Sequence, residues 1–273
     1  MNHNRSSSRQ SPLGVVKRIR RTLVLLLSCA AGGVDAASYI GLGHVFAANM
    51  TGNTVHLGMA VGRASSGDVA RAGAALIGFL IGAGIGAAIV ERDDSATAWP
   101  RVVTVTLFIE LFVLVVAAAL WRTRPTDTGA SIATTSLLLA LGVAMGMQSA
   151  AVRRLRIPGV VSTYLTGTLT MLTIGLVRRA IGARAPAPEA PTHGTGLLAG
   201  VWVIYAIGAA VTTVLSPSGG PRSLLLPIVL IGIVLAVADR DATWLSQVAL
   251  PSGRRAIHIG PTPPQWSDTG SPS

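Results

Sequence analysis

Gly33-Val34-Asp35-Ala36-Ala37, followed by Asn49-Met50-Thr51-Gly52-Asn53-Thr54, sets polar residues within an apolar part of the chain. A similar pair of segments returns later, as Gly146-Met147-Gln148-Ser149-Ala150 and Tyr164-Leu165-Thr166-Gly167-Thr168-Leu169. When Gln148 is aligned with Asp35, Gly146 falls on Gly33, and after a two-residue insertion Thr166 falls on Thr51. A duplicated set of polar segments inside apolar sequence indicates a pseudosymmetric membrane site between two internal repeats.

The composition is that of a membrane protein. Of 273 residues, 50% are hydrophobic and only 12% are charged, and the mean hydropathy is +0.58. The chain has no long charged, amphipathic block from which a separate soluble domain could fold, so a single helix bundle is expected. The net charge of +11 comes largely from Lys and Arg between and beside the apolar runs. This placement is typical of membrane topology and argues against binding of nucleic acid.

Six apolar runs are each close to the ~20 residues that a helix needs to cross the hydrocarbon core. They cover residues 22–42, 70–90, 101–121, 132–151, 195–215 and 221–238. Two further segments, 44–62 and 158–177, are polar and contain the two Thr-Gly motifs. The sequence therefore predicts an all-α, polytopic transmembrane helix bundle with an internal two-fold repeat. Six strong spans and two polar Thr-Gly segments, either re-entrant or spanning, would form it.

The bundle is expected to occupy residues 21–240, with repeats at about 21–123 and 131–240. Residues 1–20 and 241–273 are largely polar, the latter rich in Pro, Ser and Gly. Such segments bury too little apolar area to offset the entropy lost on ordering. Both are predicted to be flexible tails, and the first of them is predicted to be cytoplasmic.

Two topologies are open. If both polar segments cross the membrane, the chain has eight spans and parallel repeats; if both are re-entrant, it has six spans and inverted repeats. The distribution of Lys and Arg does not decide between them, although it favours a cytoplasmic N-terminus in both. The basic anchor at that end is Lys17, Arg18, Arg20 and Arg21. Glycines at helical spacing predict close helix contacts at Gly78, Gly82 and Gly86 in the first repeat and at Gly196 and Gly200 in the second.

The polar segments resemble the signature segments of the YoaK-like family, bacterial integral membrane proteins grouped as a domain of unknown function. The resemblance covers about residues 20–240. It rests on Gly33-Val34-Asp35, Asn49-Met50-Thr51-Gly52-Asn53-Thr54, Gly146-Met147-Gln148 and Thr166-Gly167-Thr168-Leu169. Gln148-Ser149-Ala150 departs mildly from the amide-Ala/Asn pattern of the family. The resemblance implies a membrane location and a helical fold, and no established activity.

Asp35 is the only acidic residue from residue 1 to residue 62, and it lies fourteen residues beyond Arg21, roughly 20 Å along a helix. A charged side chain at such depth costs about 2.5 to 3.5 kcal/mol on insertion scales, so it must face protein or water and needs a partner. Two interpretations are open. Asp35 is either a proton or cation site, or a structural carboxylate that caps a broken helix or pairs with a backbone amide.

Glu110 is the other deeply placed acid, near the middle of the apolar run 101–121. Contact with lipid would be too costly, so its side chain is expected to point into the bundle. There it would serve either as a proton-carrying group or as a hydrogen-bond anchor for a neighbouring helix. Asp35 and Glu110 are the two candidates for proton or ion coupling.

The Thr-Gly motifs have a mechanical rationale, because Gly52 and Gly167 weaken the helix in which each motif lies. Backbone groups freed there must be paired within the protein or with a ligand, as in the discontinuous helices that form midplane sites in transporters. The alternative is that Thr and Gly only make close helix contacts and interhelical hydrogen bonds. The predicted substrate-binding residues are Asp35, Asn49, Thr51, Gly52, Asn53, Gln148, Thr166, Gly167 and Thr168.

Enzymatic and metal chemistry have little support in the sequence. His44 and His56 flank the first motif without counterparts in the second, and Cys29 is the single cysteine. Isolated histidines do not form a metal site, so neither a metal nor another cofactor is expected. A phosphate-cradling loop, a nucleophile elbow, paired catalytic carboxylates and an HExxH-type motif are all missing from the sequence. We therefore expect that the protein is not an enzyme.

The leading functional interpretation is a small transporter or permease of the bacterial plasma (inner) membrane, with a solute or ion site between two pseudosymmetric repeats. The alternative is a non-transporting membrane scaffold whose Gly and Thr faces bind partner helices. The expected partners are the lipid bilayer and an unknown small solute or ion. Nucleic acid is not expected, and a homo-oligomer is compatible with the sequence.

Overall fold

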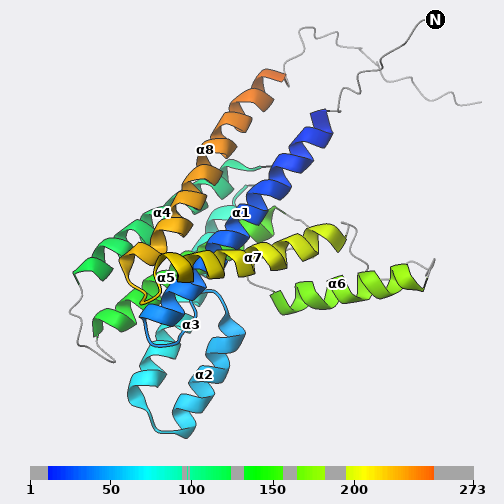
Figure 1. The fold of residues 1–273 in the computed structure, drawn as a ribbon. Coiled ribbons are helices and arrows are strands. Elements are labelled where there is room, and N and C mark those ends of the chain that lie inside the picture. Colours follow the sequence, from blue (N-terminus) through cyan, green and yellow to red (C-terminus); the bar gives the residue numbers. More distant parts are fainter. Residues whose placement is uncertain are drawn as a thin grey trace, which may run out of the picture.

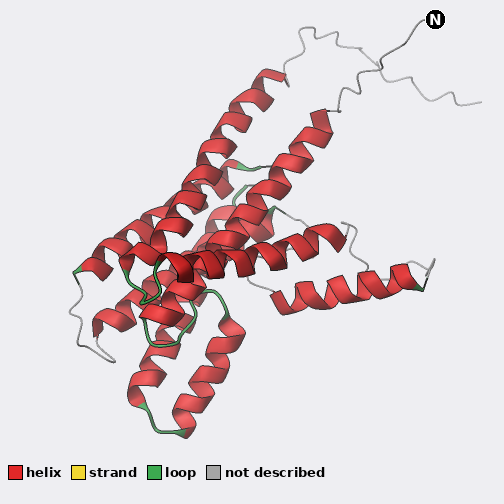
Figure 2. Ribbon diagram, viewed as in Figure 1, coloured by secondary structure: helices red, strands yellow, loops and turns green. Residues whose placement is uncertain are grey.

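The computed structural model describes residues 12–93, 97, 99–123, 132–155, 165–181 and 195–248. Within these ranges every regular element is a helix (Figure 1 and Figure 2). The predicted all-α polytopic bundle is therefore confirmed.

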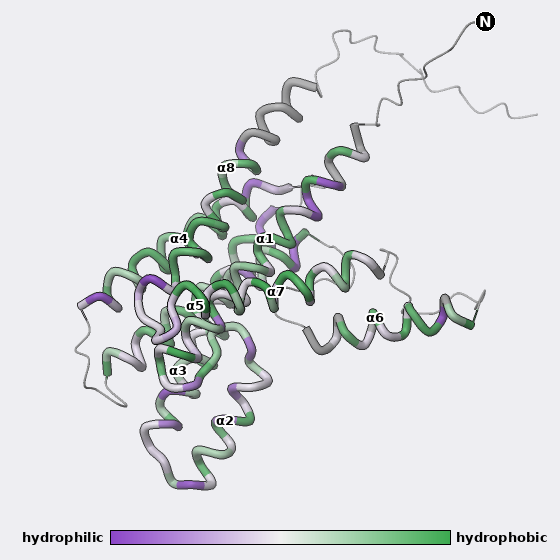
Figure 3. The backbone as a smooth tube through the Cα atoms, in the orientation of Figure 1, coloured by the Kyte–Doolittle hydropathy of each residue, from purple (hydrophilic) through white to green (hydrophobic). Residues whose placement is uncertain are grey.

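Six of the described helices are long and apolar enough to cross a membrane. Figure 3 shows the apolar stretches along them, with hydrophilic residues near several helix ends. Their apolar parts match the six predicted runs to within a few residues. These helices are α1 (Pro12–Gly41), α3 (Ser66–Val90), α4 (Arg101–Arg122), α5 (Ile132–Arg154), α7 (Thr195–Leu215) and α8 (Leu225–Val248), which follows the short 3-10 helix η1 (Pro221–Leu224).

The two polar segments form shorter helices. α2 (Met50–Gly62) has 13 residues and α6 (Leu165–Ala180) has 16, which correspond to roughly 20 and 24 Å, less than the ~30 Å of a hydrocarbon core. α2 packs beside α3, and α6 packs beside α7 (Figure 1). The part of the second polar segment before Leu165 lies outside the described residues.

The first and last helices continue beyond the residues predicted for the bundle. α1 begins at Pro12 and α8 continues to Val248, whereas the bundle was expected over residues 21–240. The remaining parts of both predicted tails, 1–11 and 249–273, lie outside the described residues.

Two helix pairs, α1 with α7 and α3 with α5, pack at glycines. Gly82 lies against the backbone carbonyl of Val143, and Gly208 lies against that of Cys29, so closely that a Cβ atom would collide in either place. Small residues allow this approach of two backbones. The contact predicted for Gly196 is wrong, because no described atom lies within 4 Å of the point where its Cβ would stand. The contacts predicted in the first repeat are confirmed at Gly78, Gly82 and Gly86.

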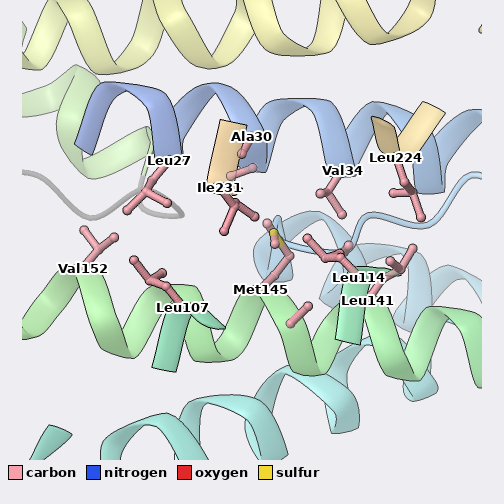
Figure 4. Packing of buried hydrophobic residues seen from close by; sticks show 14 of the residues in the cluster. Leu27, Ala30, Val34, Leu107, Leu114, Leu141, Met145, Val152, Leu224 and Ile231 are labelled. Atoms are coloured by element: carbon pink, nitrogen blue, oxygen red, sulfur yellow. The ribbon is translucent and has the colours of Figure 1, made fainter. Parts of the chain in front are cut away.

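The apolar core lies where α1 and α5 meet α4 and α8. Leu27 and Val34 of α1 face Met145 of α5, while Leu107 of α4 and Ile231 of α8 fill the space between them (Figure 4). Lipid tails are as apolar as these side chains, so close packing stabilises this core more than exclusion of water does.

Contacts at the helix ends bear on the choice between the two topologies. Arg20 of α1 donates to the carbonyl of Leu155, just after α5, and Arg154 donates to the carbonyl of Val90 at the end of α3, at 3.2 Å. At the other end of α1, Gly41 packs against Trp121 in the last turn of α4. The six-span arrangement puts each of these pairs on one side of the membrane. The eight-span arrangement would separate Arg20 from Leu155, and Gly41 from Trp121, by the bilayer, so the contacts support six spans.

Candidate functional site

Asp35 lies in α1, six residues before the helix ends, and only 3% of its surface is exposed. Oδ1 of its carboxylate accepts hydrogen bonds from the backbone N–H groups of Ala47 and Ala48, at 2.8 and 2.6 Å. Both amides belong to residues 42–49, which join α1 to α2 and which we call the pinned loop. The carboxylate thus pairs two backbone N–H groups of the loop. Without it these groups would lack a hydrogen-bond acceptor, because the membrane interior offers no water.

Tyr205 of α7 completes the surroundings of Asp35 by donating its hydroxyl to Oδ2. The two residues are 170 positions apart in the chain, so this contact joins the two predicted repeats. Asp35 therefore receives three hydrogen bonds, two from the pinned loop and one from α7. Hydrogen bonds to a charged acceptor are stronger than neutral ones, which makes Asp35 a strong link between α1, the pinned loop and α7.

Asn53 fixes the pinned loop from the other side. Its side chain is fully buried, its Oδ1 accepts from the backbone N–H of Phe46 at 2.9 Å, and its Nδ2 donates to the carbonyl of Phe46 at 2.6 Å. Asn49 caps α2 by accepting from the N–H of Gly52 at 3.2 Å. A Cβ at Gly52 would stand 3.0 Å from the Asn49 side chain, so glycine suits this tight turn. These three motif residues hold backbone in place.

The threonines of the first motif are more open to the surroundings. Thr51 and Thr54 are both exposed, and the Thr54 hydroxyl donates to the carbonyl of Met50 in its own helix, at 2.9 Å. The predicted roles of Thr51, Asn49 and Asn53 as solute ligands stay predictions.

Gln148 of α5 does not meet Asp35. Its side chain is fully buried, and its Nε2 donates to the carbonyl of Leu27 at 3.0 Å, eight residues before Asp35 and so roughly 12 Å away along α1. Its Oε1 is shut off from solvent and has no hydrogen-bond partner among the described residues. Asp35 is part of α1, and Gln148 binds to α1 from α5. The two aligned residues therefore do not form one site.

The second Thr-Gly motif lies in the first turn of α6, where Gly167 is exposed. The side chains of Thr166 and Thr168 lie outside the described residues, and their predicted roles stay predictions. α6 packs on α7 and lies apart from α2 (Figure 1). The two motifs are therefore not brought together.

Glu110 of α4 is fully buried, and neither of its carboxyl oxygens has a hydrogen-bond partner in the described part of the chain. It lies on the buried face of α4, between Leu107 and Leu114. Figure 4 shows Leu107 near Val152 and Leu114 near Leu141, both on α5. The stretch of α4 that carries Glu110 therefore packs against α5.

Tyr205 is the site residue that sequence analysis missed. Its signal is a phenol in the middle of an apolar run, since a buried Tyr hydroxyl usually finds a hydrogen-bond partner. A buried carboxylate such as Asp35 requires a hydrogen-bond donor, and Tyr205 offers a hydroxyl from a different apolar run, 195–215.

The described residues include no group of three or more His, Cys, Asp or Glu side chains that could hold a metal ion. The arrangement instead offers hydrogen-bonded carboxylate, amide and phenol groups. Groups of this kind can link helices by hydrogen bonds, and carboxyl groups can also carry protons.

Comparison with known proteins agrees with the membrane fold. A family model described as "Protein of unknown function (DUF1275)" matches residues 23–237. The chain is 37% identical over 217 residues to the "UPF0700 transmembrane protein YoaK" of Bacillus subtilis (strain 168), and the match covers 79% of this chain and 93% of that protein. The resemblance to the YoaK-like family is therefore confirmed. No solved structure matches the chain.

Proposed function

We propose, on the premise that this chain belongs to the DUF1275 family of membrane proteins of unknown function, that it is a small transporter or permease. The chain is an integral, multi-pass membrane protein. We place it in the bacterial plasma membrane with its N-terminus in the cytoplasm, and its solute or ion site between two inverted repeats. We propose transport without catalysis and without a cofactor.

The pairing of helices supports the two repeats. α1, the first helix of one half, packs on α7, the third element of the other half; α5 packs on α3 in the corresponding way. α2 packs on α3 as α6 packs on α7, and α1 contacts α8 as α5 contacts α4. With six spans each half contributes three, so the two halves would be inverted relative to each other.

The chemical difference between the halves extends beyond Asp35 and Gln148. Gly82 and Gly208 make equivalent helix contacts, and three residues before them stand Phe79 and Tyr205. Between α1 and α7 an acid of the first repeat therefore meets a phenol of the second, whereas between α5 and α3 the corresponding residues are an amide of the second repeat and a phenyl ring of the first. This difference supports an asymmetric site in a repeated framework.

The observation that carries the proposal is the fully buried carboxyl group of Glu110, for which the described part of the chain offers no hydrogen-bond partner. An acid inside a span is costly, and acids at such positions commonly mark proton or ion pathways. A protonated Glu110 carries an O–H donor, whereas the ionised form needs a cation or water. A change in protonation of Glu110 would therefore change the group that this buried carboxyl has to bind, which supports its role in coupling.

Transport can be tested with purified protein in liposomes that contain a pH-sensitive dye. Phosphate, small carboxylates, amino acids and monovalent cations are added outside, and solute-dependent proton flux is recorded. We expect Glu110→Gln to abolish the flux without loss of folded protein. If the flux is unchanged in Glu110→Gln, Asp35→Asn and Thr51→Val, the assignment of these residues to a transport site is wrong. Absence of flux for every solute, with specific co-purification of another membrane protein, would favour the scaffold.

The topology can be tested by thiol labelling on a Cys29→Ala background. Single cysteines are placed in the 63–69 loop and in the 179–190 segment, and they are labelled with a membrane-impermeant reagent in whole cells. Six spans predict that the two positions react from opposite sides of the membrane. Labelling of both from one side would contradict the inverted repeats.

The repeats can be tested through their helix contacts. Gly82→Val and Gly208→Val are expected to destabilise the bundle to a similar degree, because each adds atoms where a backbone carbonyl already lies. Gly84→Val is the matched control, since nothing lies within 4 Å of a Cβ at that position on the same helix. Equal unfolding midpoints for Gly82→Val and Gly84→Val would refute the role of the α3–α5 contact.

A further inference from the structure

A polar pocket of about 270 Å³ lies between the pinned loop, α2 and α3. Its charged and titratable lining residues come from all three segments. They are His44 from the loop, His56 and Arg63 from α2 and the residue after it, and Asp68 and Arg71 from α3. This pocket is separate from Glu110 and Gln148, which lie in the helix core.

Positive groups outnumber negative ones in this pocket. Asp68 is its one acidic lining residue, and that carboxylate already accepts hydrogen bonds from Ser65, at 2.6 Å, and from Arg71. Arg63 and the two histidines leave a surplus of hydrogen-bond donors. Such a lining suits an anion and disfavours a cation.

The guanidinium of Arg71 has a donor that is still free. Its Nε is shut off from solvent and has no hydrogen-bond partner among the residues that the structure describes. Arg71 reaches this place beneath Gly43, whose φ of +90° is readily adopted only by glycine, and a Cβ there would stand 2.9 Å from Nε. A buried N–H without an acceptor is unfavourable, and it adds to the excess of donors around the pocket.

Hydrogen bonds and ring contacts hold the framework of the pocket. Asp35 and Asn53 hold the pinned loop by its backbone, as described above. The ring of His44 packs edge-on against Tyr39 at 5.0 Å, and that of His56 lies 6.2 Å from Phe46. A preorganised set of donors binds an anion with less loss of conformational entropy than flexible surface side chains would.

We propose that this pocket binds a small oxyanion of the phosphate type, with Arg71 and Arg63 as its main ligands and His44 and His56 as further donors. Planar guanidinium groups match the oxygen geometry of phosphate, and the volume suits a small head group. The oxyanion is either free phosphate or the head group of an anionic lipid. Binding here does not require transport, so a failure of this inference would leave the proposed function standing.

Binding is tested on the full chain in nanodiscs of neutral phosphatidylcholine. Inorganic phosphate is titrated at constant ionic strength, with chloride as the reference anion, and binding is followed by calorimetry and by the thermal unfolding midpoint. A second set of nanodiscs contains phosphatidylglycerol in place of added phosphate. We expect saturable stabilisation by phosphate, or by phosphatidylglycerol if the lipid is the source.

The variants distinguish this pocket from general attraction by a basic protein. Arg71→Gln is expected to weaken binding by about tenfold or more, and Arg71→Lys to restore it only in part, because lysine lacks the planar fork. Arg63→Gln is a second variant, and it is expected to leave the fold intact because Arg63 is exposed. Arg222→Gln removes the same charge from an exposed position outside the pocket and serves as the control.

Two results would overturn the inference. One is the absence of any effect of phosphate and of phosphatidylglycerol on the wild-type protein. The other is stabilisation that is the same in the wild type, Arg63→Gln, Arg71→Gln and Arg222→Gln, since that would show attraction by net charge alone.

Discussion

Asp35 and Glu110 are both buried acids in membrane spans, yet their surroundings are opposite. Asp35 receives three hydrogen bonds from the pinned loop and α7, whereas Glu110 has no hydrogen-bond partner among the described residues. A satisfied carboxylate stabilises the fold, and an unsatisfied one costs free energy. The difference supports a structural role for Asp35 and agrees with the coupling role that we propose for Glu110.

The largest effect is expected for Asp35→Ala. This change leaves two backbone N–H groups and the Tyr205 hydroxyl without an acceptor, so the free energy of unfolding should fall by about 3 kcal/mol or more. Denaturant unfolding in mixed micelles would measure it. Glu91→Ala, at an exposed helix end, is the control and should change stability by less than about 0.5 kcal/mol. If the two changes lower stability equally, the hydrogen bonds of Asp35 do not make it more important to the fold than an exposed acid.

Tyr205→Phe should have the next largest effect. It removes one hydrogen bond to a charged acceptor and keeps the ring, so a loss of about 1.5 to 3 kcal/mol in stability is expected. The matched control is Tyr39→Phe, which keeps the ring stacking on Phe46 at 4.8 Å and should change stability little. If Tyr205→Phe is as stable as the wild type, the hydrogen bond from Tyr205 to Asp35 does not contribute to the free energy of unfolding.

Gln148→Met is expected to be milder. The change removes the hydrogen bond to the Leu27 carbonyl, but it also removes a buried oxygen that has no partner in the described structure. These two contributions oppose each other, so the net change in unfolding free energy should stay within about 1 kcal/mol. A loss as large as that for Asp35→Ala would mean that the two aligned positions are structurally equivalent after all.

Glu110→Leu should have the smallest effect on stability. It replaces an unpaired buried acid with an apolar side chain of similar size, so the protein should be at least as stable as the wild type within about 1 kcal/mol. Proton flux in liposomes should be lost at the same time. Marked destabilisation would show that Glu110 is a structural anchor, as Asp35 is.

The sequence predicted the spans well because their signal is local. A run such as 101–121 contains enough apolar residues to identify α4 without knowledge of any contact. Helix contacts were harder to predict, since many glycines share helical spacing. Gly82 and Gly208 pack against other backbones, but Gly196 does not, and only the three-dimensional arrangement distinguishes them.

The candidate site was predicted in part. Asp35 and Glu110 were identifiable as costly buried acids, but their partners were not. The donors to Asp35 include the backbone amides of Ala47 and Ala48, which carry no signal in the sequence, and a tyrosine 170 residues away. The pocket beneath the pinned loop was missed for a similar reason, since Arg71 resembled an ordinary basic residue near a helix end.

The most direct measurement compares Asp35→Asn with Glu110→Gln. Each change replaces a carboxyl group with an amide and keeps the size of the side chain. Unfolding of both variants and of the wild type is measured in the same nanodiscs at neutral pH. We predict that Asp35→Asn loses about 1 to 3 kcal/mol, because charged hydrogen bonds become neutral ones, and that Glu110→Gln is as stable as the wild type or more stable. Equal destabilisation by both, or destabilisation by Glu110→Gln alone, would contradict the distinction between the two acids.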